Sequence, residues 1–183
     1  MKPFFLFPLL ALGFAAHAEE RAIVKETIVR TTPEIAWRTW TTAEGIKSFF
    51  APDARIDARP DGPFEIYFNP CAAPGLKGAD DMRFLALQEP RLLSFTWNAP
   101  PHLPEARKQR TVVTVRLTPV GNGETRVVIH HSGWGDGGQW DQAFDYFNNA
   151  WGRVLANFKK RFDDGPIDWT EWNASLKAAA EKK

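Results

Sequence analysis

The sequence has little of several features that would point to a particular biochemistry. Cys71 is the only cysteine among 183 residues, so the chain cannot form an internal disulfide and must be stabilised by a packed core. The charges nearly cancel, with 23 basic and 22 acidic residues. This balance predicts neither a nucleic-acid-binding surface nor an electrostatic attraction to anionic membranes.

Motifs for metal, cofactor and nucleophilic chemistry are also missing. Among the four histidines, His130 and His131 are adjacent and would point to opposite faces of a strand, so they cannot bind one metal ion together. The sequence contains no Gly-x-Ser-x-Gly, dinucleotide-binding or P-loop pattern. Cys71 lies in a loop-like segment with no histidine nearby in sequence, which is typical of a tolerated loop thiol. We therefore expect no metal, no cofactor and no catalytic residue, with His131 as the one weak candidate.

The longest apolar run lies at the N-terminus. Lys2 precedes an almost unbroken apolar stretch from Phe4 to Ala16, and Ala16-His17-Ala18 then offers the small-x-small pattern of a signal peptidase site. The run is shorter than the ~20 apolar residues that span a bilayer, although an uncleaved anchor remains an alternative. We expect residues 1–18 to be a signal peptide and the mature protein to be periplasmic or secreted, without membrane insertion.

The remaining sequence alternates between strand and helix patterns. Residues 22–29 predict a first strand, a short helix then begins with Pro33 at its first position, and a second short helix follows over residues 42–50. A series of short strands comes next, ending in a hairpin at Gly121-Asn122-Gly123. The predicted strands are 55–59, 64–68, 82–87, 92–97, 109–117 and 125–131.

A long amphipathic helix is predicted from Gln139 to about Phe162, because its large apolar residues recur at spacings of three and four. The strands alternate between apolar and polar residues, which gives the sheet one buried face. That face includes Leu93, Phe95 and Trp97 on one strand and Val127, Ile129 and His131 on another. We expect an α+β domain over residues 19–165, with a curved antiparallel sheet of about six or seven strands wrapped around the long helix. Residues 166–183 would form a partly helical C-terminal tail.

Four segments of the chain combine with this order of elements: residues 32–37 (Thr-Pro-Glu-Ile-Ala-Trp), 59–64 (Arg-Pro-Asp-Gly-Pro-Phe), 89–97 (Glu-Pro-Arg-Leu-Leu-Ser-Phe-Thr-Trp) and 123–134. With them, the chain resembles the START-like helix-grip (SRPBCC) superfamily. Within it, the sequence is most similar to the group named after the activator of the 90-kDa heat-shock protein ATPase. The resemblance implies a cavity between helix and sheet that relatives use for hydrophobic ligands. We expect no cytosolic chaperone as partner, since the chain looks exported.

Three functions remain open from the sequence. The leading hypothesis is the binding of a small hydrophobic molecule. The second is a cyclase-like or dehydratase-like enzyme with His131 as general base, although His131 could equally contact a ligand or be satisfied by local partners. The third is a protein-interaction module that uses the outer sheet face or Trp169 and Trp172. The predicted ligand-binding residues are Phe84, Phe95, Trp97, His131, Trp134, Phe144, Phe147 and Trp151.

Overall fold

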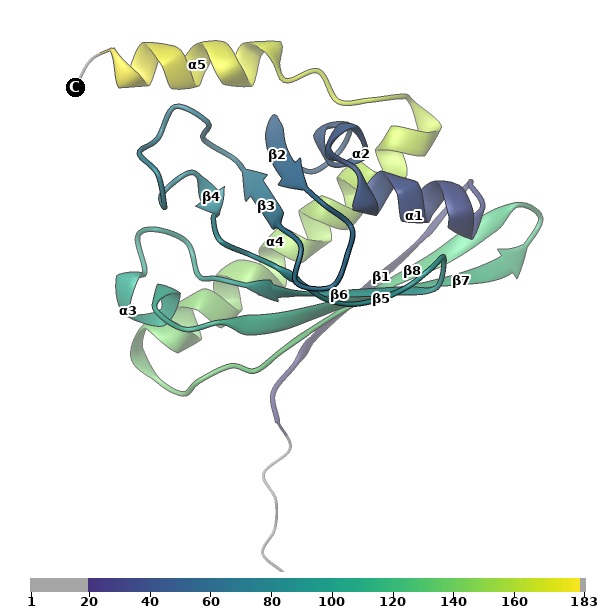
Figure 1. Ribbon diagram of the computed structural model, residues 1–183, viewed down its shortest axis with the longest axis horizontal. Coiled ribbons are helices and arrows are strands. Elements are labelled where there is room, and N and C mark those ends of the chain that lie inside the picture. Colours follow the sequence, from purple (N-terminus) through teal and green to yellow (C-terminus); the bar gives the residue numbers. More distant parts are fainter. Residues whose placement is uncertain (1–19, 182–183) are drawn as a thin grey trace, which may run out of the picture.

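The computed structural model describes residues 20–181 and contains two antiparallel sheets with helices packed against them (Figure 1). The predicted signal peptide lies outside the described residues. In chain order the elements are β1 (Ile23–Val29), α1 (Pro33–Thr41), α2 (Ala43–Lys47), β2 (Asp53–Ile56), β3 (Phe64–Tyr67), β4 (Gly78–Ala79), β5 (Phe84–Gln88), β6 (Leu92–Trp97), α3 (Pro104–Arg107), β7 (Thr111–Gly121), β8 (Glu124–Ser132), α4 (Gly138–Asp163) and α5 (Thr170–Ala180).

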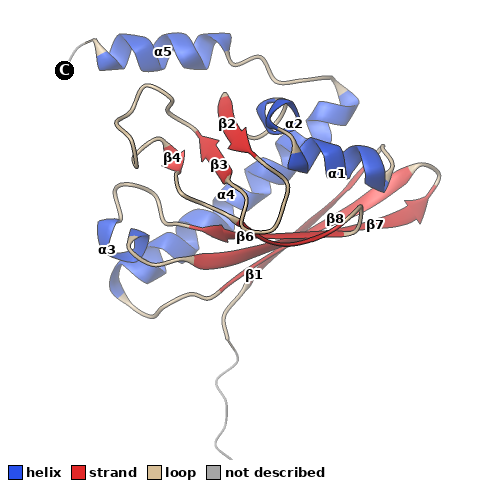
Figure 2. Ribbon diagram, in the orientation of Figure 1, coloured by secondary structure: helices blue, strands red, loops and turns tan. Residues whose placement is uncertain are grey.

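The larger sheet has five strands in the order β1-β8-β7-β6-β5, and the smaller one has the order β2-β3-β4 (Figure 2). This confirms the predicted α+β helix-grip fold. The strands are divided between two sheets, however, where the sequence predicted one sheet of about six or seven. Only an isolated bridge between Pro63 and Arg83 connects β3 to the start of β5. Beyond it, β3 pairs with β4 and β5 pairs with β6, with a register shift between Phe84 and Ala86. No continuous ladder therefore joins β3 to β5.

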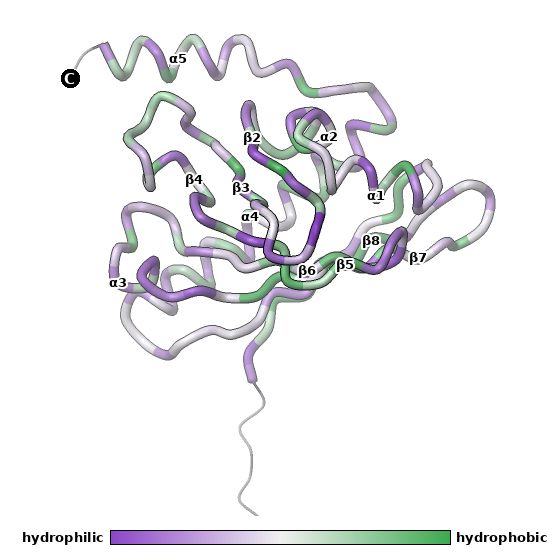
Figure 3. The backbone as a smooth tube through the Cα atoms, in the orientation of Figure 1, coloured by the Kyte–Doolittle hydropathy of each residue, from purple (hydrophilic) through white to green (hydrophobic). Residues whose placement is uncertain are grey.

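The predicted buried face is also confirmed. Strands β6, β7 and β8 each direct every second side chain into the interior, and Leu93, Phe95, Val115 and Ile129 are all fully buried. Helix α4 has 26 residues, about 39 Å at ~1.5 Å per residue, and it runs diagonally across this face (Figure 1). Figure 3 shows hydrophobic stretches gathered around β5 and β6, whereas α5 alternates between hydrophilic and hydrophobic residues.

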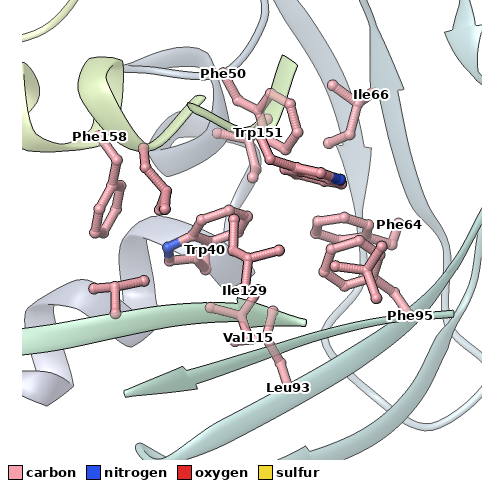
Figure 4. Packing of buried hydrophobic residues seen from close by; sticks show 14 of the residues in the cluster. Trp40, Phe50, Phe64, Ile66, Leu93, Phe95, Val115, Ile129, Trp151 and Phe158 are labelled. Atoms are coloured by element: carbon pink, nitrogen blue, oxygen red, sulfur yellow. The ribbon is translucent and has the colours of Figure 1, made fainter. Parts of the chain in front are cut away.

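The two short helices close one end of the interior. Pro33 is the first residue of α1, as predicted, and the Thr42 hydroxyl accepts a 3.0 Å hydrogen bond from the Gly45 amide to cap α2. Trp40 of α1 is fully buried, with its ring 5.0 Å from Phe49 and 5.5 Å from Phe158 of α4. Figure 4 shows Trp40 and Phe158 on one side of the core and the stacked Phe64 and Phe95 rings on the other. Large rings therefore fill the part of the interior beneath α1.

Candidate functional site

Two neighbouring clefts open beside the aromatic core. The first, of about 430 Å³, lies among residues 68–69, 76–79 and 97–102, and we call it the loop cleft. The second, of about 500 Å³, lies along residues 146–157 of α4 and beneath Trp169 and Trp172, and we call it the helix cleft. Both volumes are large enough for a small organic molecule.

An aromatic wall joins the two clefts. Phe68, Trp97, Tyr146 and Phe147 line both of them. Trp97 and Phe147 are 3% and 6% exposed and form a buried floor, whereas Tyr146 and Phe68 are 42% and 36% exposed and form a rim. Such a combination of a buried apolar floor and an exposed aromatic rim is suited to a small apolar ligand.

The indole of Trp97 has an unusual polar environment. Its ring packs against Phe50 at 5.9 Å and Trp151 at 5.5 Å, so its surroundings are aromatic. The buried Trp97 Nε1 atom has no hydrogen-bond partner among residues 20–181. Buried indole N–H groups usually find an acceptor, and Trp97 departs from this rule together with Trp40 of the core.

His131, the predicted polar residue of the inner face, is fully buried and fully hydrogen-bonded. The Trp151 indole N–H donates to His131 Nδ1 at 2.8 Å. This contact requires an unprotonated Nδ1, so neutral His131 carries its proton on Nε2 and donates to Thr111 Oγ1 at 2.7 Å. The Thr111 hydroxyl in turn donates to the Trp97 carbonyl oxygen at 3.3 Å.

The same burial holds His131 neutral. Desolvation lowers the pKa of His131 from 6.5 to about 3, and the positive charge of His130 adds to the effect. Both ring nitrogens are occupied by side chains of the fold, so neither has a free position for a ligand or for a proton from a substrate. These hydrogen bonds give His131 a structural role, in which it ties β8 to β7 and α4.

A buried ion pair supports the outer wall of the loop cleft. Arg107 of α3 contacts Asp80 at 3.2 Å, and both side chains are nearly buried. The Arg107 guanidinium also donates to the carbonyl oxygens of Gly75, Gly78 and Ala99. Burial lowers the pKa of Arg107, and the charge of Asp80 opposes this shift. One arginine thus fixes the loop before β4 against the segment after β6.

The C-terminal helix covers the helix cleft without entering the core. None of the residues of α5 is buried. The Trp169 and Trp172 indoles donate to the carbonyl oxygens of Lys47 and Phe68 at 2.6 and 2.9 Å. The Ile167 amide donates to the carbonyl oxygen of Ser48 at 2.9 Å. The tail predicted from the sequence is therefore a strap, residues 166–181, held mainly by hydrogen bonds.

The predicted ligand-binding residues fall into three groups. Trp97, Phe147 and Trp151 line one or both clefts. Phe84 and Phe95 pack around Phe64 in the core, with ring centroids 4.9 and 4.0 Å from it, and line neither cleft. The third group packs behind Phe147 near the start of α4 without lining either cleft, and it consists of His131, Trp134 and Phe144.

Sequence reasoning missed several residues of the clefts. Tyr146 lies next to Phe147 on α4 but outside its apolar stripe, and an exposed aromatic ring at such a position was the available signal. Phe68 ends the predicted strand 64–68, where its side chain reaches the rim. Trp169 and Trp172 entered the sequence analysis only in the third hypothesis, as one of two surfaces for a protein partner, and the structure places them over the helix cleft.

Residues 30–163 match the family model described as Activator of Hsp90 ATPase homolog 1-like protein. The chain belongs to this family. The match confirms the resemblance inferred from the four sequence segments, and it ends at the last residue of α4, so the strap lies beyond it. A comparison with curated proteins gave no match.

Solved structures show the same fold at low sequence identity. A protein of Mesorhizobium loti is 24% identical, with a TM-score of 0.63 over 80% of this chain and 100% of its own. The Aha1 dimer of Colwellia psychrerythraea is 19% identical, with a TM-score of 0.62 over 79% of this chain and 98% of its own. An HSP90 activator from Plasmodium falciparum is 15% identical, with a TM-score of 0.57 over 80% of this chain and 97% of its own. These identities establish the shared fold alone.

Two further properties bear on the chemistry of the described part of the chain. None of the helices within residues 20–181 combines the length and apolar composition needed to cross a membrane. Over the same range, no three His, Cys, Asp or Glu side chains come together as a set that could hold a metal ion.

Proposed function

We propose that this protein binds a small apolar or aromatic molecule in the joined loop and helix clefts. The observation that carries the proposal is the aromatic wall that both clefts share, with Trp97 and Phe147 as its floor. A ligand that covers this wall would remove apolar surface from water, at about 25 cal/mol per Å². Family membership agrees with this proposal, since this fold typically binds ligands.

The rim provides a test that leaves the core intact. Tyr146 lines both clefts and is 42% exposed, so Tyr146→Ala should weaken ligand binding about tenfold while leaving the fold stable. Ile28 is similarly exposed, at 47%, but lies on β1 away from both clefts, so Ile28→Ala is the matched control.

The ligand itself can be sought by native mass spectrometry of the protein purified from its own host. We expect a bound small molecule that is lost on denaturation and whose occupancy falls in Tyr146→Ala but not in Ile28→Ala. A ligand retained equally by both variants would place the binding site elsewhere. The absence of any adduct, together with no calorimetric response to small aromatic compounds, would contradict the proposal.

We further propose that residues 1–18 are removed on export and that the mature protein acts in the periplasm or outside the cell. The support is the apolar run before Ala16-His17-Ala18. In that compartment the protein would not meet a cytosolic chaperone, although one protein of similar fold is an HSP90 activator. Cell fractionation and the mass of the protein test this: we expect a periplasmic chain that begins near Glu19, whereas a full-length cytoplasmic chain would contradict it.

The hydrogen bonds of His131 disfavour the enzyme alternative. A general base needs a nitrogen lone pair that faces the substrate, and the only one in neutral His131 accepts the Trp151 N–H. We therefore propose binding, without a reaction that uses His131.

A further inference from the structure

One buried amide side chain lines the loop cleft. Asn98 follows the last residue of β6 and is only 5% exposed. Apart from the tryptophans, the other polar side chains that line the clefts are half-buried or exposed, namely Asn69, Lys77, His102, Tyr146, Arg153 and Asn157. Buried polar atoms usually have hydrogen-bond partners, so the partners of Asn98 indicate what its place in the cleft requires.

The amide of Asn98 is satisfied on one side only. Its Nδ2 donates to the backbone carbonyl oxygen of Asp80 at 3.3 Å. Exchanging the amide nitrogen and oxygen would bring two oxygens together, so this contact fixes the orientation of the amide. Within residues 20–181 no hydrogen bond reaches Asn98 Oδ1, and this oxygen is not among the fully buried atoms that lack a partner. Oδ1 is therefore an unused acceptor that retains accessible surface in a residue of the cleft lining.

The neighbouring ion pair holds this amide in place. Asp80, whose carbonyl oxygen accepts from Asn98, contacts Arg107 at 3.2 Å and accepts the Gly78 amide at 2.9 Å through its carboxylate. Arg107 also donates to the carbonyl oxygen of Ala99, the residue after Asn98. Both segments that position the amide are thus fixed by one arginine. An acceptor positioned in this way needs little ordering when a ligand binds.

The charges around the loop cleft determine which donor fits this acceptor. Lys77 lines the same cleft, and no Asp or Glu side chain lines either cleft. A ligand ammonium would lose hydration and meet a neutral amide beside a second cation, which does not compensate a buried charge. A neutral hydroxyl or N–H group avoids this cost, because it exchanges one hydrogen bond to water for one to the amide.

We infer that the ligand is an aromatic molecule with a neutral hydroxyl or N–H donor, as in a phenol, and that this donor binds Asn98 Oδ1 while the ring covers Trp97 and Phe147. All three residues line the loop cleft, so one small ligand can contact them together. The inference rests on the proposed binding function and adds the chemical class of the ligand to it. It also assigns the selection of that class to Asn98, a residue that the sequence analysis did not single out.

A pair of probes that differ only at the donor tests this inference. 2-Naphthol and 2-methylnaphthalene carry a hydroxyl and a methyl group of similar size at the same ring position. The methyl compound is the more hydrophobic of the two, so the informative quantity is the affinity for 2-naphthol relative to that for 2-methylnaphthalene. We expect this relative affinity, measured by isothermal titration calorimetry, to fall about fivefold in Asn98→Leu, which is the effect of losing one net hydrogen bond.

The second amide of the loop cleft provides the matched control. Asn69 lines the same cleft, but its Oδ1 already accepts the Cys71 amide at 3.2 Å. Asn69→Leu should therefore leave the relative affinity of the two probes unchanged. An equal fall in both variants, or no fall in Asn98→Leu, would overturn the assignment of Asn98 as the ligand acceptor.

A measurement on the unmodified protein covers the case in which Asn98→Leu does not fold. The side-chain carbonyl carbon of Asn98, assigned by NMR, should shift downfield with 2-naphthol but not with 2-methylnaphthalene, because accepting a hydrogen bond polarises the carbonyl. Binding of both probes without such a shift would overturn the inference and leave the proposed binding function standing. Failure of both probes to bind would count against the binding function itself and the inference with it.

Discussion

Acidification below pH 6.5 should destabilise this protein through His131. The native state holds the pKa of His131 at about 3, compared with 6.5 when the side chain is solvated. Between these two pH values the unfolded chain binds a proton that the native chain excludes, so falling pH favours unfolding. Each pH unit in this window is worth about 1.4 kcal/mol, so acidification from pH 6.5 to pH 5 should lower the free energy of unfolding by about 2 kcal/mol.

Urea unfolding of three proteins at pH 7.5 and pH 5 isolates this contribution. The wild type should lose about 2 kcal/mol more than His131→Gln, which has no titrating ring at this position. His130→Gln is the matched control, because His130 is the adjacent residue on the same strand and its side chain is exposed. It should keep most of the wild-type pH dependence, because the buried His131 and its hydrogen bonds remain in place. If His131→Gln and the wild type lose the same stability on acidification to within about 0.5 kcal/mol, the conclusion that His131 is buried and neutral is wrong.

Two further predictions concern the walls of the clefts. Arg107→Gln should lower the free energy of unfolding by about 3 kcal/mol, because it leaves Asp80 buried without its partner. Arg59→Gln is the control, since it removes an exposed ion pair with Asp57 and should lower the free energy of unfolding by less than about 0.5 kcal/mol. Urea unfolding measures both variants, and equal effects would contradict a stabilising role of the Arg107–Asp80 pair. Deleting the residues after Gly165 should lower stability by only about 2 kcal/mol, since the strap is held by three hydrogen bonds and α5 buries no residue. The same deletion should speed ligand release in stopped-flow experiments, and an unchanged rate would show that the strap does not cover the ligand.

The parts of the fold with a clear periodicity could be predicted from the sequence. The long helix was expected from Gln139 to Phe162 and runs from Gly138 to Asp163, because its apolar stripe spans seven turns without a conflicting signal. Alternation identified the buried side of β6, β7 and β8 for the same reason. Helix α3 was not predicted, because a four-residue helix is too short to show a period.

The division into two sheets depends on contacts that periodicity does not encode. Alternation specifies which side of a strand is buried, but not which neighbour the strand pairs with. Here residues 63 and 83, next to β3 and β5, meet at one bridge, and beyond it β3 pairs with β4 while β5 pairs with β6. A run of strands that looks uniform in sequence therefore separates into a main sheet and a smaller one that helps to form the wall of the loop cleft.

The candidate site could be located only in outline from the sequence. An aromatic residue on a buried face can be core or cleft wall, and Phe95 and Trp97 illustrate both outcomes on one strand. They share a face of β6, yet Phe95 stacks on Phe64, whereas Trp97 lies at the end of the strand where the packing opens. Distance from the filled end of the core separates the two roles, and this is a property of the assembled layers.

His131 shows that the pairing of a buried polar group, and not its presence, indicates its role. From the sequence, His131 is the polar residue of the inner face and therefore the natural candidate for ligand chemistry. In the fold, Thr111 and Trp151 satisfy both of its nitrogens, so a ligand could reach it only by breaking existing hydrogen bonds. Trp97 lines both clefts, whereas its Nε1 atom is buried without a partner, as is that of the core residue Trp40. The apolar ring of Trp97, rather than its N–H group, is therefore what the floor of the clefts offers to a ligand.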